Sequence, residues 1–376
     1  MFGKRISLFS LFGFKVSIDM SWFVLAIFIS WSLAEGLFPH YFAGFSKATY
    51  WWMGIAGAFG LFVSIVFHEF CHSIVARLYG LPMKGITLFI FGGVAEMEHE
   101  PTSPKAELLM AIAGPISSVL LGAVIYLAYV VGAREGLPGP ISSVLRYLAW
   151  LNFILAGFNL LPAFPLDGGR VLRSILWWSK KNQRWATRIA SRLGSGFGLF
   201  LIIFGIFSFL GGNFLGGVWY FLIGTFIRNA SQMSYRQLLV RKTLEGEQVR
   251  NFMRSDLISV PSFISVEEFV DDYFYKYHFQ MFPVLDNGLL IGCVTTQQVK
   301  ETPKEQWAQR TVRELAKPCS EENTISSQAD AVQALTIMNR TGSSRLLVVD
   351  GGQLVGIITL KDMLKFFAIK IDLEGE

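Results

Sequence analysis

The sequence predicts a helical membrane domain followed by a soluble α/β tail. Hydrophobic residues make up 52% of the 376 residues and charged residues only 16%, whereas soluble proteins carry about 25% charged residues. The shortage of charge is concentrated in residues 20–230, where long apolar stretches recur. Residues 235–376 have the mixed composition of an ordinary soluble domain. We therefore expect an integral, multi-pass membrane protein in a lipid bilayer, with a globular C-terminal part.

Six apolar segments are candidates for transmembrane helices. A helix needs about 20 apolar residues to cross the hydrocarbon core. The candidate segments are 19–36, 52–78, 106–131, 142–165, 195–211 and 213–230. Little more than Gly211, Gly212 and Asn213 separates the last two, which predicts a tight hairpin.

The distribution of basic residues predicts the orientation of these segments. Lysine and arginine are frequent at the N-terminus, in 166–194 and after the sixth segment, whereas the other loops carry little beyond Lys47 and Arg134. By the positive-inside rule, both termini lie in the cytosol, and an even number of spans agrees with this. The net charge of +5 is explained by these membrane flanks, so we expect no direct contact with nucleic acid.

A short β-hairpin is predicted within 83–105, between the second and third segments. Ile86 and Leu88 alternate with Thr87 and Phe89, and Gly92-Gly93 is expected to turn the chain. Open strand edges are tolerated at membrane depth only where protein or a watery cavity shields them. Such an edge can bind an extended peptide as an added strand.

The main chemical signal is His68-Glu69-Phe70-Cys71-His72 within the second apolar segment. Residues i and i+4 share one face of a helix, so both imidazoles can reach one ion, and zinc favours such nitrogen ligands. Glu69 lies beside that face and can accept a proton from an attacking water molecule. Ionisable residues inside an apolar helix are costly unless they serve a site, which argues against two incidental histidines.

A zinc ion held by two histidines needs a further protein ligand, and Asp167 is the best candidate. Pro162 and Pro165 end the fourth segment and place Asp167 at a depth similar to that of the histidines. Alternatively, Asp167 caps a helix that starts at Gly168, or it pairs with Arg170. The incomplete zinc site favours the role of ligand.

Four motifs together resemble the site-2 protease family of intramembrane zinc metalloproteases. They are HEFCH, FGGVAEME, AIAGPISS at 111–118 and NLLPAFPLDGGR at 159–170, and the resemblance covers about 1–235, the predicted protease domain. It implies one Zn²⁺ per chain held by His68, His72 and Asp167, with Glu69 as catalytic base. It also implies that Asn159 lies near the metal and steadies the substrate or the oxyanion; the alternative for Asn159 is a hydrogen bond in helix packing.

The tail contains an internal repeat of roughly 60 residues, at 247–300 and 311–368. Each copy reads as helix, strand, strand, helix, and the pair resembles CBS modules, the regulatory domains named after cystathionine beta-synthase. Gly356-Ile-Ile-Thr359-Leu-Lys-Asp362 matches the family pattern for adenine nucleotides (ATP, ADP or AMP), which implies Thr359 at phosphate and Asp362 at ribose. Gln298 replaces the acid in the first module. The alternative is a purely structural pair that forms a homodimer.

These observations predict an intramembrane zinc endopeptidase that cleaves a membrane-spanning protein substrate. The resemblance implies a single-span substrate such as an anti-sigma factor or a membrane-tethered regulator, with proteolysis controlled by nucleotide at the CBS pair. The alternative is a CBS-regulated membrane transporter or channel, in which charged residues within the spans would mark an ion path. An ion path does not require paired histidines with a glutamate and a distant aspartate.

Overall fold

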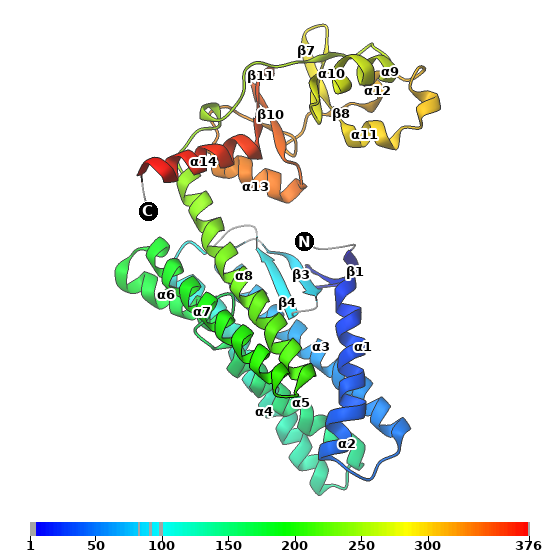
Figure 1. The fold of residues 1–376 in the computed structure, drawn as a ribbon, viewed down its shortest axis with the longest axis vertical. Coiled ribbons are helices and arrows are strands. Elements are labelled where there is room, and N and C mark those ends of the chain that lie inside the picture. The colour runs from blue at the N-terminus through cyan, green and yellow to red at the C-terminus, as the bar shows by residue number, and fades with distance from the viewer. Residues whose placement is uncertain (1–4, 82, 90–91, 98–100, 375–376) are drawn as a thin grey trace. The chain divides into compact units, whose positions relative to one another are not determined.

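The computed structural model describes residues 5–81, 83–89, 92–97 and 101–374. The chain divides into two compact units, Met1–Leu238 and Leu239–Glu376. Figure 1 shows that the first unit consists mainly of long helices, whereas the second combines small sheets with shorter helices.

Long helices form most of the first unit. They are α1 (Met20–Ser32) with a π-helical turn (Leu33–Leu37), α2 (Phe38–Tyr41), α3 (Lys47–Leu78), α4 (Pro104–Arg134), α5 (Gly139–Asn159), α6 (Asp167–Lys180), α7 (Gln183–Leu210) and α8 (Phe214–Leu244). Side chains cap four of the starts, because Asp19, Ser46, Ser103 and Asn182 each accept a hydrogen bond from a backbone N–H in the first turn.

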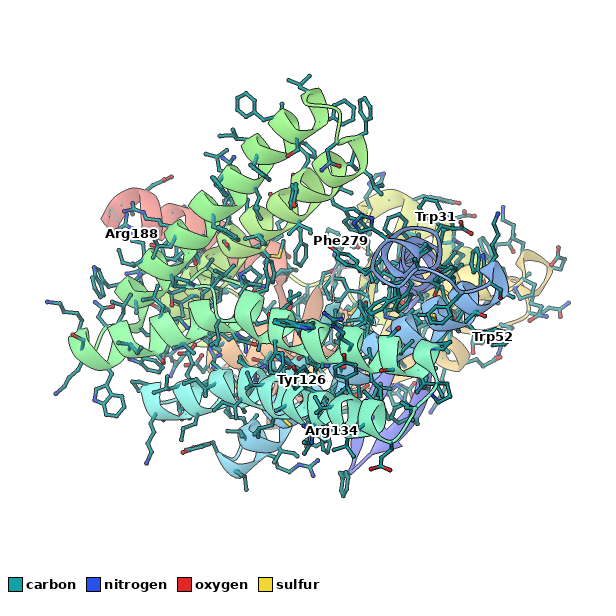
Figure 2. All side chains as sticks on the ribbon, turned by 90° about the horizontal axis from the view of Figure 1, so that it is seen from below. Trp31, Trp52, Tyr126, Arg134, Arg188 and Phe279 are labelled. Atoms are coloured by element: carbon teal, nitrogen blue, oxygen red, sulfur yellow. The ribbon has the colours of Figure 1, made fainter. Side chains whose placement is uncertain are left out.

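Within the described residues, five segments are long and apolar enough to cross a membrane. They are Met20–Tyr41, Lys47–Leu78, Pro104–Arg134, Gly139–Asn159 and Gln183–Leu210. Their surfaces expose large apolar side chains, of which Trp31, Trp52 and Tyr126 can be followed in Figure 2. Exposed apolar surface along several long helices fits a lipid environment.

The sixth predicted segment, 213–230, forms the first part of α8, which continues to Leu244 and is not among these five helices. The predicted tight hairpin between α7 and α8 is present, with Gly212 at φ +90°. Pairs of glycines let α7 and α8 approach closely: a Cβ on Gly198 would lie 2.6 Å from the Gly224 carbonyl oxygen, and one on Gly205 would lie 2.7 Å from that of Gly217.

Most helix boundaries differ from those of the predicted segments, and two of them lie next to the basic segment 166–194. The fourth segment was expected to reach residue 165, but α5 ends at Asn159 and the chain turns before α6 because prolines follow. The fifth was expected to begin at 195, but α7 begins at Gln183. Much of the basic segment 166–194 is therefore helical.

A four-stranded sheet lies beside the helices. Its strands are β1 (Arg5–Leu11), β2 (Phe14–Asp19), β3 (Met83–Phe89) and β4 (Gly92–Met97), in the order β1-β2-β3-β4. Strands β2 and β3 are parallel and the other pairs antiparallel. Val16 and Ile18 pack with Ile86 and Leu88 in one buried cluster.

The predicted β-hairpin, which is β3 and β4, is thus half of a larger sheet, and β1 and β2 were not predicted. The expected turn at Gly92-Gly93 is wrong: Phe89 pairs with Gly92, so both glycines lie in β4. The connection falls at 90–91, outside the described residues.

The second unit contains two similar sheets. The first has the order β5-β6-β7-β8, with β5 (Val260–Pro261), β6 (Met281–Asp286), β7 (Leu289–Thr295) and β8 (Lys317–Pro318); the second has the order β11-β10-β9, with β9 (Thr324–Ile325), β10 (Arg345–Asp350) and β11 (Gln353–Thr359). The helices are α9 (Val266–Phe269), a π-helical turn (Val270–Phe274), α10 (Tyr275–Tyr277), α11 (Thr296–Glu301), α12 (Val312–Leu315), α13 (Ala331–Thr341) and α14 (Leu360–Glu374), with 3₁₀ turns at Val249–Asn251 and Lys304–Gln306. In each sheet a long antiparallel pair lies beside a short parallel strand.

Each repeat contributes a segment to the other. Val249 and Phe252 precede the first repeat's sheet but pack in the core of the second, with Leu346. Conversely, Val312 packs in the core of the first repeat, and β8 pairs with β7. The two repeats therefore form one interlocked body.

Candidate metal centre

Three predicted ligand side chains converge at one point in the first unit. Nε2 of His68 and Nε2 of His72 lie 3.0 and 3.1 Å from Oδ2 of Asp167, and 3.1 Å from each other. The histidines are 4% and 7% exposed, and the Asp167 side chain is 14% exposed. Residues 95 and 99 positions apart in the sequence thus offer three donor atoms to one small volume.

The turn between α5 and α6 brings Asp167 to α3. Asp167 is the first residue of α6, and two glycines follow it. A Cβ on Gly168 would lie 2.1 Å from the Leu160 carbonyl oxygen, and one on Gly169 would lie 2.4 Å from the Phe164 nitrogen. Only glycine allows the start of α6 to pack so closely on this turn.

In the part of the chain that the structure describes, Asp167 neither caps α6 nor pairs with Arg170, the two alternatives to a ligand role. The helix α6 has Leu166 at its N-cap and no side-chain cap. Oδ2 of Asp167 lies close to the Nε2 atoms of both histidines, and Asp167 forms no ion pair with Arg170 among the described residues. Its carboxylate is therefore directed at the histidine pair.

Helix α4 holds the far side of both imidazole rings. Nδ1 of His72 lies 2.6 Å from the Met110 carbonyl oxygen, and Nδ1 of His68 lies 2.8 Å from Oγ of Ser118. A carbonyl oxygen can only accept, so Nδ1 of His72 carries a proton, and in the neutral ring its Nε2 then presents a lone pair.

The donor set fits a zinc ion. Two imidazole nitrogens and one carboxylate oxygen are one of the common ligand sets of catalytic zinc sites. Three atoms with lone pairs this close together repel one another unless a cation lies between them. Gly114 of α4 keeps the space open, because a Cβ there would lie 2.2 Å from Nε2 of His72 and 2.5 Å from Nε2 of His68. These three residues could hold the metal.

Glu69 lies next to the cluster, under strand β4. It is half-buried, and a Cβ on Gly93 would come within 2.7 Å of its Cγ atom. The strand backbone therefore passes directly over the glutamate. Strand β4 is at the edge of its sheet, so within the described part of the chain no further strand pairs with the segment beside Glu69.

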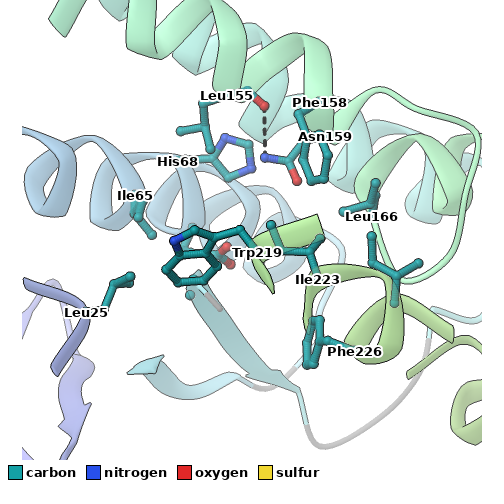
Figure 3. A pocket seen from close by; sticks show the side chains of 14 residues that line it. Leu25, Ile65, His68, Leu155, Phe158, Asn159, Leu166, Trp219, Ile223 and Phe226 are labelled. Atoms are coloured by element: carbon teal, nitrogen blue, oxygen red, sulfur yellow. Dashed lines mark hydrogen bonds between the residues drawn. The ribbon is translucent and has the colours of Figure 1, made fainter. Parts of the chain in front are cut away.

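A cavity of about 300 Å³ opens beside His68 and Glu69. Figure 3 shows Asn159 beside His68, and Trp219, Ile223 and Phe226 of α8 also line the cavity. Asn159 donates a hydrogen bond to the Leu155 carbonyl oxygen of its own helix at 3.0 Å. This bond uses one of its two amide hydrogens and holds the side chain at the cavity wall.

The predicted nucleotide residues lie at the start of α14. Oγ1 of Thr359 donates to Oδ2 of Asp362 at 2.6 Å and accepts from the Asp362 nitrogen at 3.2 Å, as in a helix cap. Nη2 of Arg254 lies 2.7 Å from Oδ1 of Asp362. Burial raises the pKa of Asp362, but hydrogen bonds from Arg254 and Thr359 outweigh it and leave the pKa below its ordinary value.

Gln298 occupies the matching place in the first repeat. Its Oε1 accepts from the Thr295 nitrogen at 2.7 Å, and its Nε2 donates to the Leu315 carbonyl oxygen at 2.5 Å. Both ends of the Gln298 amide are therefore engaged within the fold.

Several residues near the cluster were not predicted from the sequence. Ser118 and the Met110 carbonyl contact the histidines, and α8 lines the cavity. The four-residue spacing of Gly114 and Ser118, equal to that of the histidines, was the available signal. The sequence contains no corresponding signal for the contribution of α8.

Comparisons with known proteins match both units. Residues 56–137 and 136–205 match the model of peptidase family M50, and 249–303 and 312–369 each match the CBS domain. The Synechocystis sp. protein sll0528 is 34% identical over 96% of this chain and 95% of its own length. The zinc metalloprotease MJ0392 of Methanocaldococcus jannaschii is 34% identical over 82% of this chain and 84% of its own length.

A solved structure is also similar. The site-2 protease from Methanocaldococcus jannaschii is 31% identical, covering 61% of this chain and 94% of that chain, with a TM-score of 0.44. The family-model matches and the two relatives, each 34% identical over more than four fifths of both chains, show the family. The chain belongs to peptidase family M50, the site-2 protease family of zinc metalloproteases, and is a multi-pass membrane protein that carries a pair of CBS domains.

Proposed function

We propose that this protein is an intramembrane endopeptidase in which His68, His72 and Asp167 hold one zinc ion and Glu69 is the catalytic base. The observation that carries the proposal is the convergence of three donor atoms within 3.1 Å of one another, two of them on α3, a helix long and apolar enough to cross a membrane, and the third at the start of α6. Zinc bound there would act as a Lewis acid toward a peptide carbonyl and lower the pKa of a water molecule.

The residues around the centre divide the remaining work. Glu69 faces the cavity beside His68 and accepts the proton of the attacking water, then returns it to the leaving amine. Asn159 retains one amide hydrogen for the substrate carbonyl or the oxyanion. The apolar residues of α5 and α8 exclude bulk water from the cavity.

We propose that the substrate is a single-span membrane protein, such as an anti-sigma factor or a membrane-tethered regulator. A peptide bond is inaccessible to catalysis while it lies within a helix, so the substrate must be extended at the cut. The free edge of β4 supports this, because a peptide added there as a strand would lie beside Glu69.

Co-expression with candidate single-span regulators tests the proposal. The wild-type protein should release the regulator's soluble part, and Glu69→Gln should abolish release while the purified variant keeps about one zinc per chain. Asp167→Ala should lose the zinc as well. Cleavage by Glu69→Gln at the wild-type rate would exclude the base role, and full zinc content in Asp167→Ala would exclude that ligand.

We propose six spans with both termini in the cytosol, α8 being the sixth. The basic residues around α6 and α7 and after α8 support this orientation. In intact cells, a membrane-impermeant maleimide should label Gly136→Cys, between α4 and α5, and leave the exposed Cys319 of the tail unlabelled. Labelling of Cys319 in intact cells would contradict the proposed topology, because it would place the tail outside the cell.

We further propose that the domains follow the ranges 1–235, 247–300 and 311–368, and that the second CBS module binds an adenine nucleotide that modulates proteolysis. The supporting observation is the ionised Asp362 carboxylate next to the Thr359 hydroxyl, whereas Gln298 in the first module is neutral and is hydrogen-bonded at both ends of its amide. Control of proteolysis requires that nucleotide bind two arrangements of the tail unequally. A homodimer through the tail is the alternative use of the pair.

A further inference from the structure

One face of α4 meets both histidines. His68 and His72 are four residues apart on α3, and their partners Ser118, Gly114 and Met110 follow at four-residue intervals on α4. Because His72 meets residue 110 and His68 meets residue 118, the two helices run antiparallel. Residues at this spacing share one helix face, so a single stripe of α4 contacts both rings.

The two hydrogen bonds act differently. The Met110 carbonyl can only accept, so it imposes the Nδ1–H form on His72. The Ser118 hydroxyl can accept or donate, but when it accepts from Nδ1–H of His68, Nε2 is left with its lone pair. Histidines that bind metals generally donate their other N–H in this way, which fixes the tautomer and the ring orientation.

We propose that Ser118 is a positioning residue of the zinc centre, holding His68 in the tautomer and orientation that present Nε2 to the metal. This inference rests on the proposed function, in which His68 is a zinc ligand. Ser118 is 1% exposed, and its oxygen lies 2.8 Å from the ring nitrogen, so bulk water cannot replace it easily. The contact with His72 is made by the backbone carbonyl of Met110, which remains after any substitution at that position. The contact with His68 is made by the Ser118 side chain, which a mutation can remove.

The same stripe of α4 also supports the third ligand. Glu107, one turn before Met110, is fully buried and pairs with Arg173 of α6, whose Nε donates at 2.5 Å. Arg173 lies on the helix that Asp167 begins. Helix α4 therefore positions His72 through a carbonyl, His68 through a hydroxyl and Asp167 through the ion pair that anchors α6.

Ser117 provides a matched control. It is buried to a similar degree, 6% exposed, and is adjacent in sequence to Ser118. Its hydroxyl donates to the Gly114 carbonyl oxygen of its own helix at 2.7 Å and reaches neither histidine. Serine-to-alanine changes at 117 and 118 thus remove the same atom from the same helix, and only one of them touches the metal centre.

The test compares the zinc affinity of the purified full-length Ser118→Ala and Ser117→Ala variants, measured by competition with a chromophoric chelator. Ser118→Ala should bind zinc about 10–100-fold more weakly than wild type, the usual effect of losing such a partner. Ser117→Ala should bind as wild type does. The zinc-induced rise in Tm should shrink in Ser118→Ala, while the Tm of the metal-free variant stays close to that of metal-free wild type.

Three results would overturn the proposal. These are wild-type zinc affinity in Ser118→Ala, an equal loss of affinity in both serine variants, and a fall in Tm of Ser118→Ala that is the same with and without zinc. Failure of the proposed function is distinguishable, because the wild-type protein would then contain no zinc that His68→Ala removes.

Discussion

At the scale of single residues, two glycines leave space for the groups of the proposed site. Gly114 leaves room next to the imidazole nitrogens, and Gly93 leaves room above the Glu69 side chain. The space beside Gly114 would hold the proposed metal, and the space beside Gly93 holds the side chain of the proposed base, Glu69. Substituting each glycine therefore separates metal binding from proton transfer.

Gly114→Ala should abolish zinc binding and cleavage together. The added methyl would lie 2.2 Å from Nε2 of His72, so it occupies the position that the metal needs. Zinc analysis of the purified protein should give far less than one ion per chain. Gly157→Ala is the control, since its added Cβ would meet nothing within 4 Å beyond the neighbouring backbone of its own helix. One zinc per chain in Gly114→Ala would contradict the assigned position of the ion.

Gly93→Ala should keep zinc and lose activity. The added methyl would lie 2.7 Å from Cγ of Glu69 and 3.1 Å from Cγ2 of Ile65, so the glutamate must move. A displaced base should slow cleavage by about 10²-fold or more. Measured together, unchanged zinc content and reduced turnover would support the Glu69 role, and a variant that cleaves normally would argue against it.

At the scale of elements, a buried ion pair fastens α6 to α4. Arg173 is 5% exposed and Glu107 is fully buried, and the guanidinium also lies 5.0 Å from the centre of the Phe164 ring. Burying two charges is favourable only when they are paired with good geometry. This pair lies two turns along the helix that carries Asp167, so its role includes the placement of that carboxylate.

Arg173→Met should destabilise the protein by about 3–5 kcal/mol, because it leaves the Glu107 charge buried without its partner. It should also weaken zinc binding by loosening the start of α6. Unfolding in detergent and zinc analysis test the two effects. Lys180→Met, at the exposed end of the same helix, should change neither. Equal stability of the two variants would show that the ion pair contributes little.

The sheet shows why an element can be missed. The hairpin at 83–105 was predicted from its alternating pattern, yet β2 has the same signal, with Phe14, Val16 and Ile18 buried on one face. A basic, apolar N-terminus before a membrane helix is also typical of a cytosolic flank, and that interpretation hid the alternation. Parallel pairing of β2 with β3 joins segments about 70 residues apart, which no local pattern reveals.

At the scale of the whole molecule, the tail carries the proposed nucleotide site and the membrane unit carries the proposed protease site. If the second CBS module is the nucleotide site, Asp362→Ala in the full-length protein should weaken binding of ATP, ADP or AMP about 10–100-fold, the loss expected for a hydrogen bond to a charged group. Calorimetry measures this. Gln298→Ala in the first module is the control and should leave binding unchanged. Absence of heat with millimolar nucleotide in the wild-type protein would favour a dimerising tail.

The sequence by itself determined the family, the histidine pair and the repeat. A four-residue spacing guarantees that His68 and His72 share a helix face, and apolar length identifies membrane helices, because both follow from helix geometry. Asp167 could be chosen as the third ligand because few polar residues with this chemistry lie at a similar depth. Predictions that depend on local periodicity therefore needed no coordinates.

Only the tertiary structure decided which distant groups meet. The contacts of Ser118 and the Met110 carbonyl with the rings, the passage of β4 over Glu69 and the α8 wall of the cavity depend on how helices pack. The exchange of segments between the repeats, which brings Arg254 to Asp362, is equally invisible in the sequence. Such contacts are set by interhelix distance and strand order, and these depend on the packing of many side chains at once.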